Sequence, residues 1–297
     1  MKLSVKIGLF VLFSLSMLFF FILMIASFSS VEMNGNVAVI PINGVISTFS
    51  EGGFGFSSTP SSTIVEFIES ANKDDSIKAI VLEINSPGGA PVASKEIADA
   101  LSKTTKPSVA VIREVGASGA YWVASAADTI YANDISVVGS IGVLASYIEF
   151  AGLLQDYNVT YERVVGGKYK DIGSPYKELS TEERVILQKH VDLLHAYFIH
   201  AVALNRNMSD SEIKKLATGE FWLGAQAKEL GLVDELGDMT TVKDSLEKKL
   251  GYSVEFVRYE KEQSIFDLLS SFSYNHGFAI GQGATHQLEQ ASATLRT

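Results

Sequence analysis

The stretch VGASGAYW, residues 115–122, joins an apolar run at residues 109–115 to a segment, residues 117–127, whose composition predicts a helix. Ser118 stands at this junction between small neighbours. The start of a helix presents free backbone N–H groups and the positive end of the helix dipole, which favour a nearby anion. This geometry suits a nucleophilic serine. The pattern is G-x-S-G and not the G-x-S-x-G of α/β-hydrolases, so the octet alone does not separate a catalytic turn from one that serves close packing.

A second glycine turn lies upstream. The apolar run at residues 77–84 ends in NSPGG, residues 85–89. A buried strand that ends in Pro-Gly-Gly exposes backbone N–H groups, and such groups can hold a tetrahedral oxyanion. If both runs belong to one parallel sheet, their turns lie at the same edge, and Ser118 is expected beside an oxyanion hole.

A serine nucleophile needs a base, and no histidine occurs between Ser118 and His190. A lysine that is held neutral can replace histidine in this role. Three lysines in one short segment are candidates, namely Lys168, Lys170 and Lys177.

Metal and cofactor chemistry has little support in the sequence. The chain has no cysteine. Its histidines are His190, His195, His200, His276 and His286. The first three recur every five residues along a predicted helix at residues 181–207, so their rings point in different directions and do not form an i, i+4 metal pair. No metal ion or cofactor is therefore predicted.

Several motifs occur in a fixed order between residues 37 and 237. They are INSPGG at 84–89, ASGAY at 117–121, VGSIGV at 138–143, YKD at 169–171 followed by Ser174-Pro175, and GLVD at 231–234 within 224–237. In this order they resemble the short signal peptide peptidases of the SppA type. That family consists of membrane-anchored serine proteases with a Ser/Lys dyad.

The resemblance implies a role for individual residues. It makes Ser118 the nucleophile, Lys170 the general base, Gly88 or Gly89 together with Gly119 the oxyanion donors, and Ser140 the hydroxyl that orients the lysine ammonium. The motif match, and not the chemistry, selects Lys170 over Lys168. Ala120 stands where many relatives carry a second glycine, which narrows the turn and removes no reactive group.

A lysine accepts a proton only when it is neutral, and an ordinary lysine has a pKa near ~10.4. Burial in an apolar site disfavours the ammonium and lowers that pKa. An apolar setting for the base and an activity that rises with pH are therefore expected. The resemblance also implies a homo-oligomer in which the lysine of one protomer lies beside the serine of the next, because only one copy of the motifs at 85–89 and 116–121 is present.

The N-terminal segment predicts a membrane anchor. Residues 8–28 carry no charge, and Lys2 and Lys6 precede them. A run of this length spans a bilayer as a helix and exceeds the usual apolar core of a cleaved signal peptide, although cleavage near residues 26–28 is the alternative. The positive-inside rule then places the rest of the chain on the extracytoplasmic side of the cytoplasmic membrane. The net charge of −10 argues against nucleic acid as a partner.

The sequence predicts an α/β fold in which strands and helices alternate, which implies a parallel sheet covered by helices. The predicted strands are 36–40, 44–47, 78–85, 108–115 and 252–259, and the predicted helices are 90–103, 117–127, 181–207, 209–217, 240–250 and one capped by Ser61 or Ser62. The resemblance adds the ClpP/crotonase fold of stacked ββα units. The expected organisation is a stub and transmembrane helix at 1–30, a protease domain at 31–262 and a tail at 263–297 that is helical or partly disordered.

These features predict a serine endopeptidase that cleaves hydrophobic peptides, such as released signal peptides, in or near the membrane. A membrane protease of the stomatin-clipping type would use the same chemistry. A crotonase-type acyl-CoA enzyme would need acidic residues near the glycine turns, and residues 85–94 contain none. A catalytically silent membrane scaffold is the alternative from a different class. Tyr121, Trp122, Val143 and Leu144 suit either a hydrophobic cleft or an ordinary core.

Overall fold

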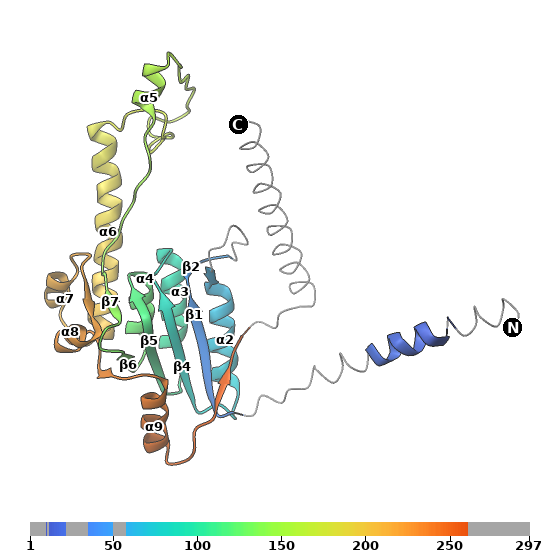
Figure 1. Ribbon diagram of the computed structural model, residues 1–297. Coiled ribbons are helices and arrows are strands. Elements are labelled where there is room, and N and C mark those ends of the chain that lie inside the picture. Colours follow the sequence, from blue (N-terminus) through green and yellow to red (C-terminus); the bar gives the residue numbers. More distant parts are fainter. Residues whose placement is uncertain (1–9, 11, 22–34, 50–57, 261–297) are drawn as a thin grey trace, which may run out of the picture. The chain divides into compact units, whose positions relative to one another are not determined.

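The computed structural model describes residues 10, 12–21, 35–49 and 58–260 (Figure 1). The chain divides into two compact units, residues 1–258 and 259–297, and only Tyr259 and Glu260 of the second are described. The domain boundaries predicted after residues 30 and 262 lie outside the described residues. Residues 12–21 are helical, and the described residues include no helix with the length and hydropathy of a membrane span.

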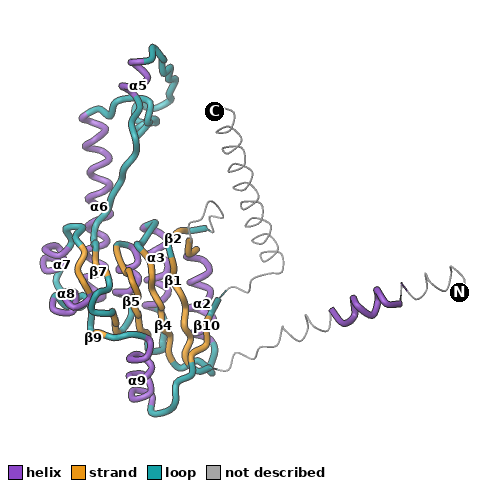
Figure 2. Tube along the Cα trace, viewed as in Figure 1, coloured by secondary structure: helices purple, strands orange, loops and turns teal. Residues whose placement is uncertain are grey.

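A mixed sheet forms the centre of the first unit (Figure 2). Its main path, in spatial order, is β10 (Phe256–Arg258), β1 (Val37–Asn43), β4 (Ala79–Ser86), β5 (Ser108–Ala117), β6 (Thr129–Ala132) and β9 (Glu235–Leu236), all parallel. The strand β7 (Val137–Gly139) pairs parallel with β5 and antiparallel with β8 (Phe221–Leu223). A second small sheet joins β2 (Val45–Ser47) and β3 (Ser58–Pro60). The α/β prediction is confirmed, and the antiparallel β7–β8 pair makes the sheet mixed.

Helices cover both faces of the sheet. Figure 1 shows α2 (Ser61–Lys73), α3 (Pro91–Ser102) and α4 (Gly119–Ser125) on one face and α9 (Met239–Leu250) on the other. Against α9 the strands pack a buried cluster that consists of Val37, Val39, Ala79, Val81, Val109, Val111, Tyr131, Val242, Leu246 and Val254. The alternate strand residues, such as Ile40, Leu82 and Ile112, are also buried. Strands that are covered on both faces read as continuous apolar runs, and this explains the sequences VAVI, AIVL and VAVI.

Strand register brings three strand ends together at one edge. Gly116 of β5 pairs with Ser86 of β4 on one side and with Val138 of β7 on the other. The first half of β5 pairs with β6 instead, so β5 changes its neighbour along its length. The residues that follow β4, β5 and β7 therefore meet at the carboxyl end of the sheet, where parallel α/β folds place their sites.

An arm leaves the sheet after β7 and consists of residues 142–193. It carries α5 (Ala151–Asp156), a turn at residues 166–173 and the first half of α6 (Thr181–Asn205). Figure 1 shows α5 near the end of α6 that is distant from the sheet. The second half of α6 returns to the domain, where Phe198, Ile199, Val202 and Ala203 are buried. Two short helices, α7 (Asp210–Leu216) and α8 (Gly224–Glu229), follow it.

Helix ends show what local sequence predicts well and badly. The predicted capping box of α6 is confirmed, because the Glu183 N–H donates to the Ser180 hydroxyl at 3.2 Å and the Ser180 N–H donates to the Glu183 carboxylate at 3.1 Å. The predicted serine cap of α2 is wrong. Pro60 occupies the N-cap, and the Ser61 hydroxyl donates to Glu96 at 2.5 Å instead. The predicted strand at 252–259 shortens to β10.

Candidate active site

Ser118 occupies the turn between β5 and α4 in a strained conformation. Its φ is 53° and its ψ is −127°, a region that residues with a side chain seldom adopt. The Ser118 N–H donates to the Gly139 carbonyl at 2.8 Å, and the Ser118 carbonyl accepts from the Trp122 N–H at 3.1 Å. These bonds hold the backbone in place, while the side-chain hydroxyl has no hydrogen-bond partner in the described part of the chain. A half-buried hydroxyl on a fixed, strained turn is available for attack on a substrate.

Of the three glycine amide groups next to Ser118, two are available to bind an oxyanion. The Gly88 N–H donates to the Ser86 hydroxyl at 3.1 Å, so this group is already used. The N–H groups of Gly89 and Gly119 donate to no acceptor within the described residues. The two sites are close, since a Cβ added to Gly119 would lie 3.3 Å from the Gly89 nitrogen. Of the predicted oxyanion donors, Gly89 and Gly119 thus have the free N–H groups that such a hole requires.

Gly88 supports this arrangement through its backbone shape. Its φ is +99°, and a Cβ at this position would lie 2.6 Å from the Gly119 nitrogen and 2.9 Å from the Ser118 Cβ. Side chains are strained at such φ values, and atoms at these distances must move apart. The absence of a side chain at Gly88 is therefore a condition for the close approach of the two turns.

Replacement of Gly88 by alanine is expected to displace the Gly119 N–H and to lower kcat for peptide hydrolysis by about 10²-fold or more. We also expect a loss of about 1–3 kcal/mol in the free energy of unfolding, because the backbone is strained and crowded. Steady-state kinetics and thermal unfolding measure both effects. The matched control is Gly152→Ala in α5, where an added Cβ meets nothing within 4 Å. A Gly88→Ala enzyme with wild-type kcat would contradict the assignment of the Gly119 N–H as an oxyanion donor.

Ser140 follows β7 on the other side of Ser118. Its φ is 49°, its N–H donates to the Glu220 carbonyl at 2.8 Å, and its hydroxyl donates to the Gly219 carbonyl at 3.3 Å. The preceding residue, Gly139, accepts the hydrogen bond from the Ser118 N–H. The structure thus brings Gly88, Gly89, Ser118, Gly119 and Ser140 together at the ends of three neighbouring strands.

A hollow of about 180 Å³ adjoins Ser118. It is lined by Gly89, Pro91, Ser118, Gly119, Trp122, Gly142, Val143, Leu144, Leu194 and Phe198. Most of these side chains are apolar, and the described residues bring no lysine to the lining. The hollow fits an apolar substrate side chain beside the nucleophile.

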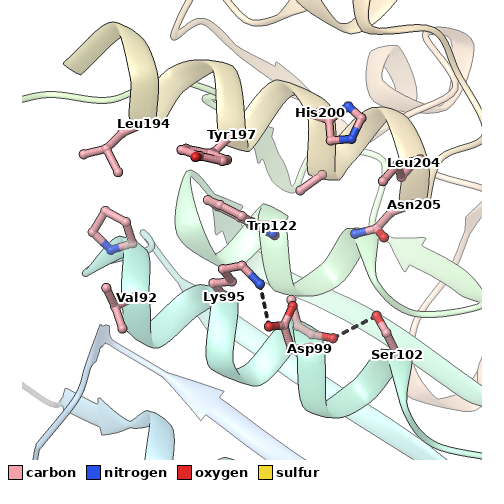
Figure 3. A pocket seen from close by; sticks show the side chains of 13 residues that line it. Val92, Lys95, Asp99, Ser102, Trp122, Leu194, Tyr197, His200, Leu204 and Asn205 are labelled. Carbon is pink, nitrogen blue, oxygen red and sulfur yellow. Dashed lines mark hydrogen bonds and ion pairs between the residues drawn. The ribbon is translucent and has the colours of Figure 1, made fainter. Parts of the chain in front are cut away.

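A larger groove of about 410 Å³ continues from this hollow between α3 and α6 (Figure 3). Pro91, Trp122 and Leu194 line both spaces. In Figure 3 Trp122 lies between Val92 and Lys95 of α3 and Tyr197 of α6. The Trp122 ring also stacks on Phe198, with ring centroids 4.9 Å apart and an interplanar angle of 11°. A continuous apolar surface therefore extends from Ser118 along α6.

The expected hydrophobic cleft is formed in part by residues that were not foreseen. Trp122, Val143 and Leu144 line the hollow, whereas Tyr121 is fully buried and donates its hydroxyl hydrogen to the Leu232 carbonyl at 2.8 Å. Burial raises the pKa of the Tyr121 phenol, which keeps it neutral. Leu194 and Phe198 come from α6, and their i, i+4 spacing was the available signal for a shared apolar face.

Lys170 lies in the turn at residues 166–173 of the arm and is exposed. It does not line the hollow at Ser118, and its side chain has no hydrogen bond or ion pair among the described residues. Within a single chain the structure therefore does not bring Lys170 to Ser118, and the expected apolar surroundings of the base are not formed by one copy.

The two competing lysines differ from Lys170 in their partners. The Lys168 ammonium lies 2.6 Å from a Glu182 oxygen, and Lys177 pairs with Glu183. Hydrogen bonds to these carboxylates raise the pKa of Lys168 and of Lys177, so both remain ammonium ions near neutral pH. Of these three lysines, Lys170 alone has no side-chain partner within the part of the chain that the structure describes.

Histidines play no part in the hollow. His190 contacts the Ile186 carbonyl at 2.8 Å, and His200 lies 3.1 Å from Asp210. Over residues 10, 12–21, 35–49 and 58–260, no group of three or more His, Asp or Glu side chains has an arrangement that suits a metal ion. The groups that one copy of the chain places at this site are a serine hydroxyl and backbone amides.

A serine on a strained strand-to-helix turn, beside free amide groups at the edge of a largely parallel sheet, defines the class of serine hydrolases. The comparisons with known proteins assign the family. Residues 100–253 match the family model described as peptidase family S49, and residues 56–133 match the model described as Clp protease. The chain belongs to peptidase family S49 and is a serine protease.

Several relatives agree with this assignment. A candidate protease of Methanocaldococcus jannaschii is 36% identical over 224 residues, which cover 74% of this chain and 71% of the relative. A candidate signal peptide peptidase, SppA, of Enterococcus faecium is 34% identical over 73% of this chain and 64% of its own length. Protease 4 of Haemophilus influenzae is 30% identical over 70% of this chain, and the match spans 36% of that protein.

Proposed function

We propose that this protein is an endopeptidase that cleaves hydrophobic peptides, such as released signal peptides, with a dyad of Ser118 and Lys170. The observation that carries the proposal is the strained Ser118 turn beside the free N–H groups of Gly89 and Gly119. The apolar hollow and the groove along α6 support hydrophobic peptides as the substrate class. Two of the relatives described above are named as a signal peptide peptidase and as Protease 4.

The reaction follows from these groups. Lys170, when neutral, accepts the proton of the Ser118 hydroxyl as its oxygen attacks the peptide carbonyl. The N–H groups of Gly89 and Gly119 stabilise the oxyanion of the tetrahedral intermediate. The lysine then donates the proton to the leaving amine, and an acyl-enzyme forms. A water molecule attacks the ester while the lysine takes its proton, and the lysine gives this proton to the Ser118 oxygen as the bond from that oxygen to the acyl carbon breaks, which releases the acid product.

The dyad is proposed to form between copies of the chain in a homo-oligomer. Two observations support this. Lys170 is absent from the lining of the Ser118 hollow, and the arm that carries it exposes many large apolar side chains. They include Leu144, Ile148, Tyr157, Val159, Val164, Tyr176 and Val185. Exposed apolar surface of this extent is typical of an interaction surface, and a neighbouring copy is the partner that would bring a lysine to the serine.

The working place of the enzyme is proposed from its N-terminal sequence. The uncharged residues 8–28, preceded by Lys2 and Lys6, favour a single membrane span with the protease domain on the extracytoplasmic side. A membrane-bound protease at this face would meet hydrophobic peptides that remain after protein export. Protease protection of the full chain in oriented membrane vesicles tests the location, and digestion of the domain only in inside-out vesicles would contradict it.

Labelling with a serine-directed fluorophosphonate tests the proposed function directly. We expect mass spectrometry of the labelled protein to find the adduct on Ser118, together with cleavage of a hydrophobic reporter peptide. If the assembled protein neither reacts with the probe nor cleaves the peptide, the proposal of a catalytic role fails and a scaffold role is favoured.

Mixed assemblies test whether the dyad is shared. When Ser118→Ala and Lys170→Ala chains are co-expressed in equal amounts, random mixing in a shared-dyad ring restores about a quarter of the sites. Peptidase activity of the co-purified oligomer measures this, with each variant alone as the control. An inactive mixed oligomer that contains both chains in equal amounts would show that the dyad does not form between copies.

A further inference from the structure

The Lys170 side chain has no hydrogen bond or ion pair among the described residues, but the residues on both sides of it are fixed. The turn is closed by the Lys170 N–H, which donates to the Gly167 carbonyl at 3.1 Å. Before Lys170, the Lys168 ammonium and the Tyr169 hydroxyl both donate to the Glu182 carboxylate. Glu182 belongs to the first turn of α6. The segment that leads into Lys170 is thus tied to the start of this helix.

After Lys170, the Asp171 side chain is held from two directions. One oxygen lies 3.0 Å from the Arg163 guanidinium and the other lies 3.6 Å from the Lys177 ammonium. Only 10% of the Asp171 side chain is exposed. Neither oxygen accepts a hydrogen bond of good geometry from the described residues, so charge attraction is the interaction that holds it. An asparagine would keep the shape of Asp171 and lose this attraction.

The contacts of Asp171 also lead to the start of α6. Lys177 contacts Glu183, which forms the capping box with Ser180. The Lys177 ammonium and the Ser180 N–H lower the pKa of Glu183 to about 2, so this carboxylate stays ionised under ordinary conditions. Lys177 and Glu183 thus connect Asp171 to the first turn of α6.

We propose that Asp171 and Glu182 are positioning residues for Lys170, which hold the turn against the first turn of α6 so that the lysine projects in a fixed direction. The inference rests on the proposed role of Lys170. A base that must reach the serine of a neighbouring copy needs a rigid support, because a small displacement of a reacting group lowers the rate strongly. Neither the contacts of Glu182 nor those of Asp171 involve the Lys170 side chain, which can therefore extend into the site.

The test compares Asp171→Asn and Glu182→Gln in the full chain. We expect Asp171→Asn to lower kcat for a hydrophobic reporter peptide by about tenfold or more with little change in KM, since the variant displaces the base and not the cleft. Glu182 is half exposed, so Glu182→Gln removes its ion pair with Lys168 without leaving a buried charge. A smaller loss in kcat, with wild-type thermal unfolding and oligomer size, is expected for it.

The turnover of the folded oligomer separates positioning from loss of folded protein. Charged groups near the turn are Arg163, Lys168, Asp171, Lys177, Glu182 and Glu183. In Asp171→Asn, kcat per folded oligomer should fall while the midpoint of the pH profile stays that of the wild type, because the base is displaced and not replaced. If kcat per folded oligomer is that of the wild type and only the yield or the melting temperature is lower, the role of Asp171 is structural only and the inference is overturned.

Glu229→Gln in α8 is the matched control. This carboxylate lies outside the arm, is exposed and has no partner in the described part of the chain. It should behave as wild type in every measurement. If Lys170→Ala is inactive while Asp171→Asn and Glu182→Gln keep the wild-type kcat, the positioning inference fails alone. If Lys170→Ala is active, the proposed dyad itself fails.

Discussion

Replacement of Ser118 by alanine is expected to lower kcat for peptide hydrolysis by at least about 10³-fold, because no acyl-enzyme can form without the hydroxyl. Alanine retains the Cβ at the strained position, and among the described residues the Ser118 hydroxyl has no hydrogen-bond partner that the change would leave unpaired. The fold should therefore persist. Steady-state kinetics with a hydrophobic reporter peptide, together with the melting temperature and the oligomer size, measures the result.

Ser62 provides the control for this experiment. It is an exposed serine of α2 that lines neither the hollow nor the groove. Ser62→Ala should change kcat by less than about twofold, as expected for a surface substitution away from the reacting atoms. A Ser118→Ala protein that cleaves the peptide at the wild-type rate would eliminate Ser118 as the nucleophile.

Loss of Lys170 has the second largest expected effect. We expect Lys170→Ala to lower kcat by about 10²–10⁴-fold, which is the range that a general base contributes. Lys170→Arg should be as inactive, because a guanidinium keeps the positive charge and cannot lose its proton in a protein. Activity of the wild-type enzyme should rise with pH, since only the neutral lysine accepts a proton.

Lys168 separates the two assignments of the base. Its ammonium is held by Glu182, which makes it a poor base, and the Tyr169 hydroxyl still contacts Glu182 when Lys168 is removed. Lys168→Arg should retain most of the activity because it preserves this ion pair. An inactive Lys168→Arg enzyme combined with an active Lys170→Ala enzyme would move the base to Lys168.

Local sequence was sufficient for the main elements and for the nucleophile turn. Apolar runs at β1, β4 and β5 predict buried parallel strands because helices cover both faces of the sheet. The capping box at Ser180 and Glu183 is a short-range hydrogen-bond pattern, and it is formed as predicted. Short strands such as β7 and β8 were missed, since three residues carry too little periodicity to be recognised.

Which groups are free to act was decided by tertiary contacts. Sequence motifs left Gly88 and Gly89 equivalent as oxyanion donors, and only the bond from Gly88 to the Ser86 hydroxyl distinguishes them. Likewise, three lysines of similar chemistry lie close together in the chain. Their contacts with α6 distinguish them, because Lys168 pairs with Glu182 and Lys177 pairs with Glu183, and Lys170 has no such pair among the described residues.

The sequence by itself determined that a serine stands at a strand-to-helix turn and that a glycine turn ends the neighbouring strand. These are local properties of the backbone, fixed by residue types at adjacent positions. The tertiary structure decided that β5 changes its neighbour from β6 to β7, that Leu194 and Phe198 of α6 complete the apolar hollow, and that Lys170 lies on an arm outside it. Such relations join segments that are distant along the chain, and strand register and packing set them rather than any local pattern.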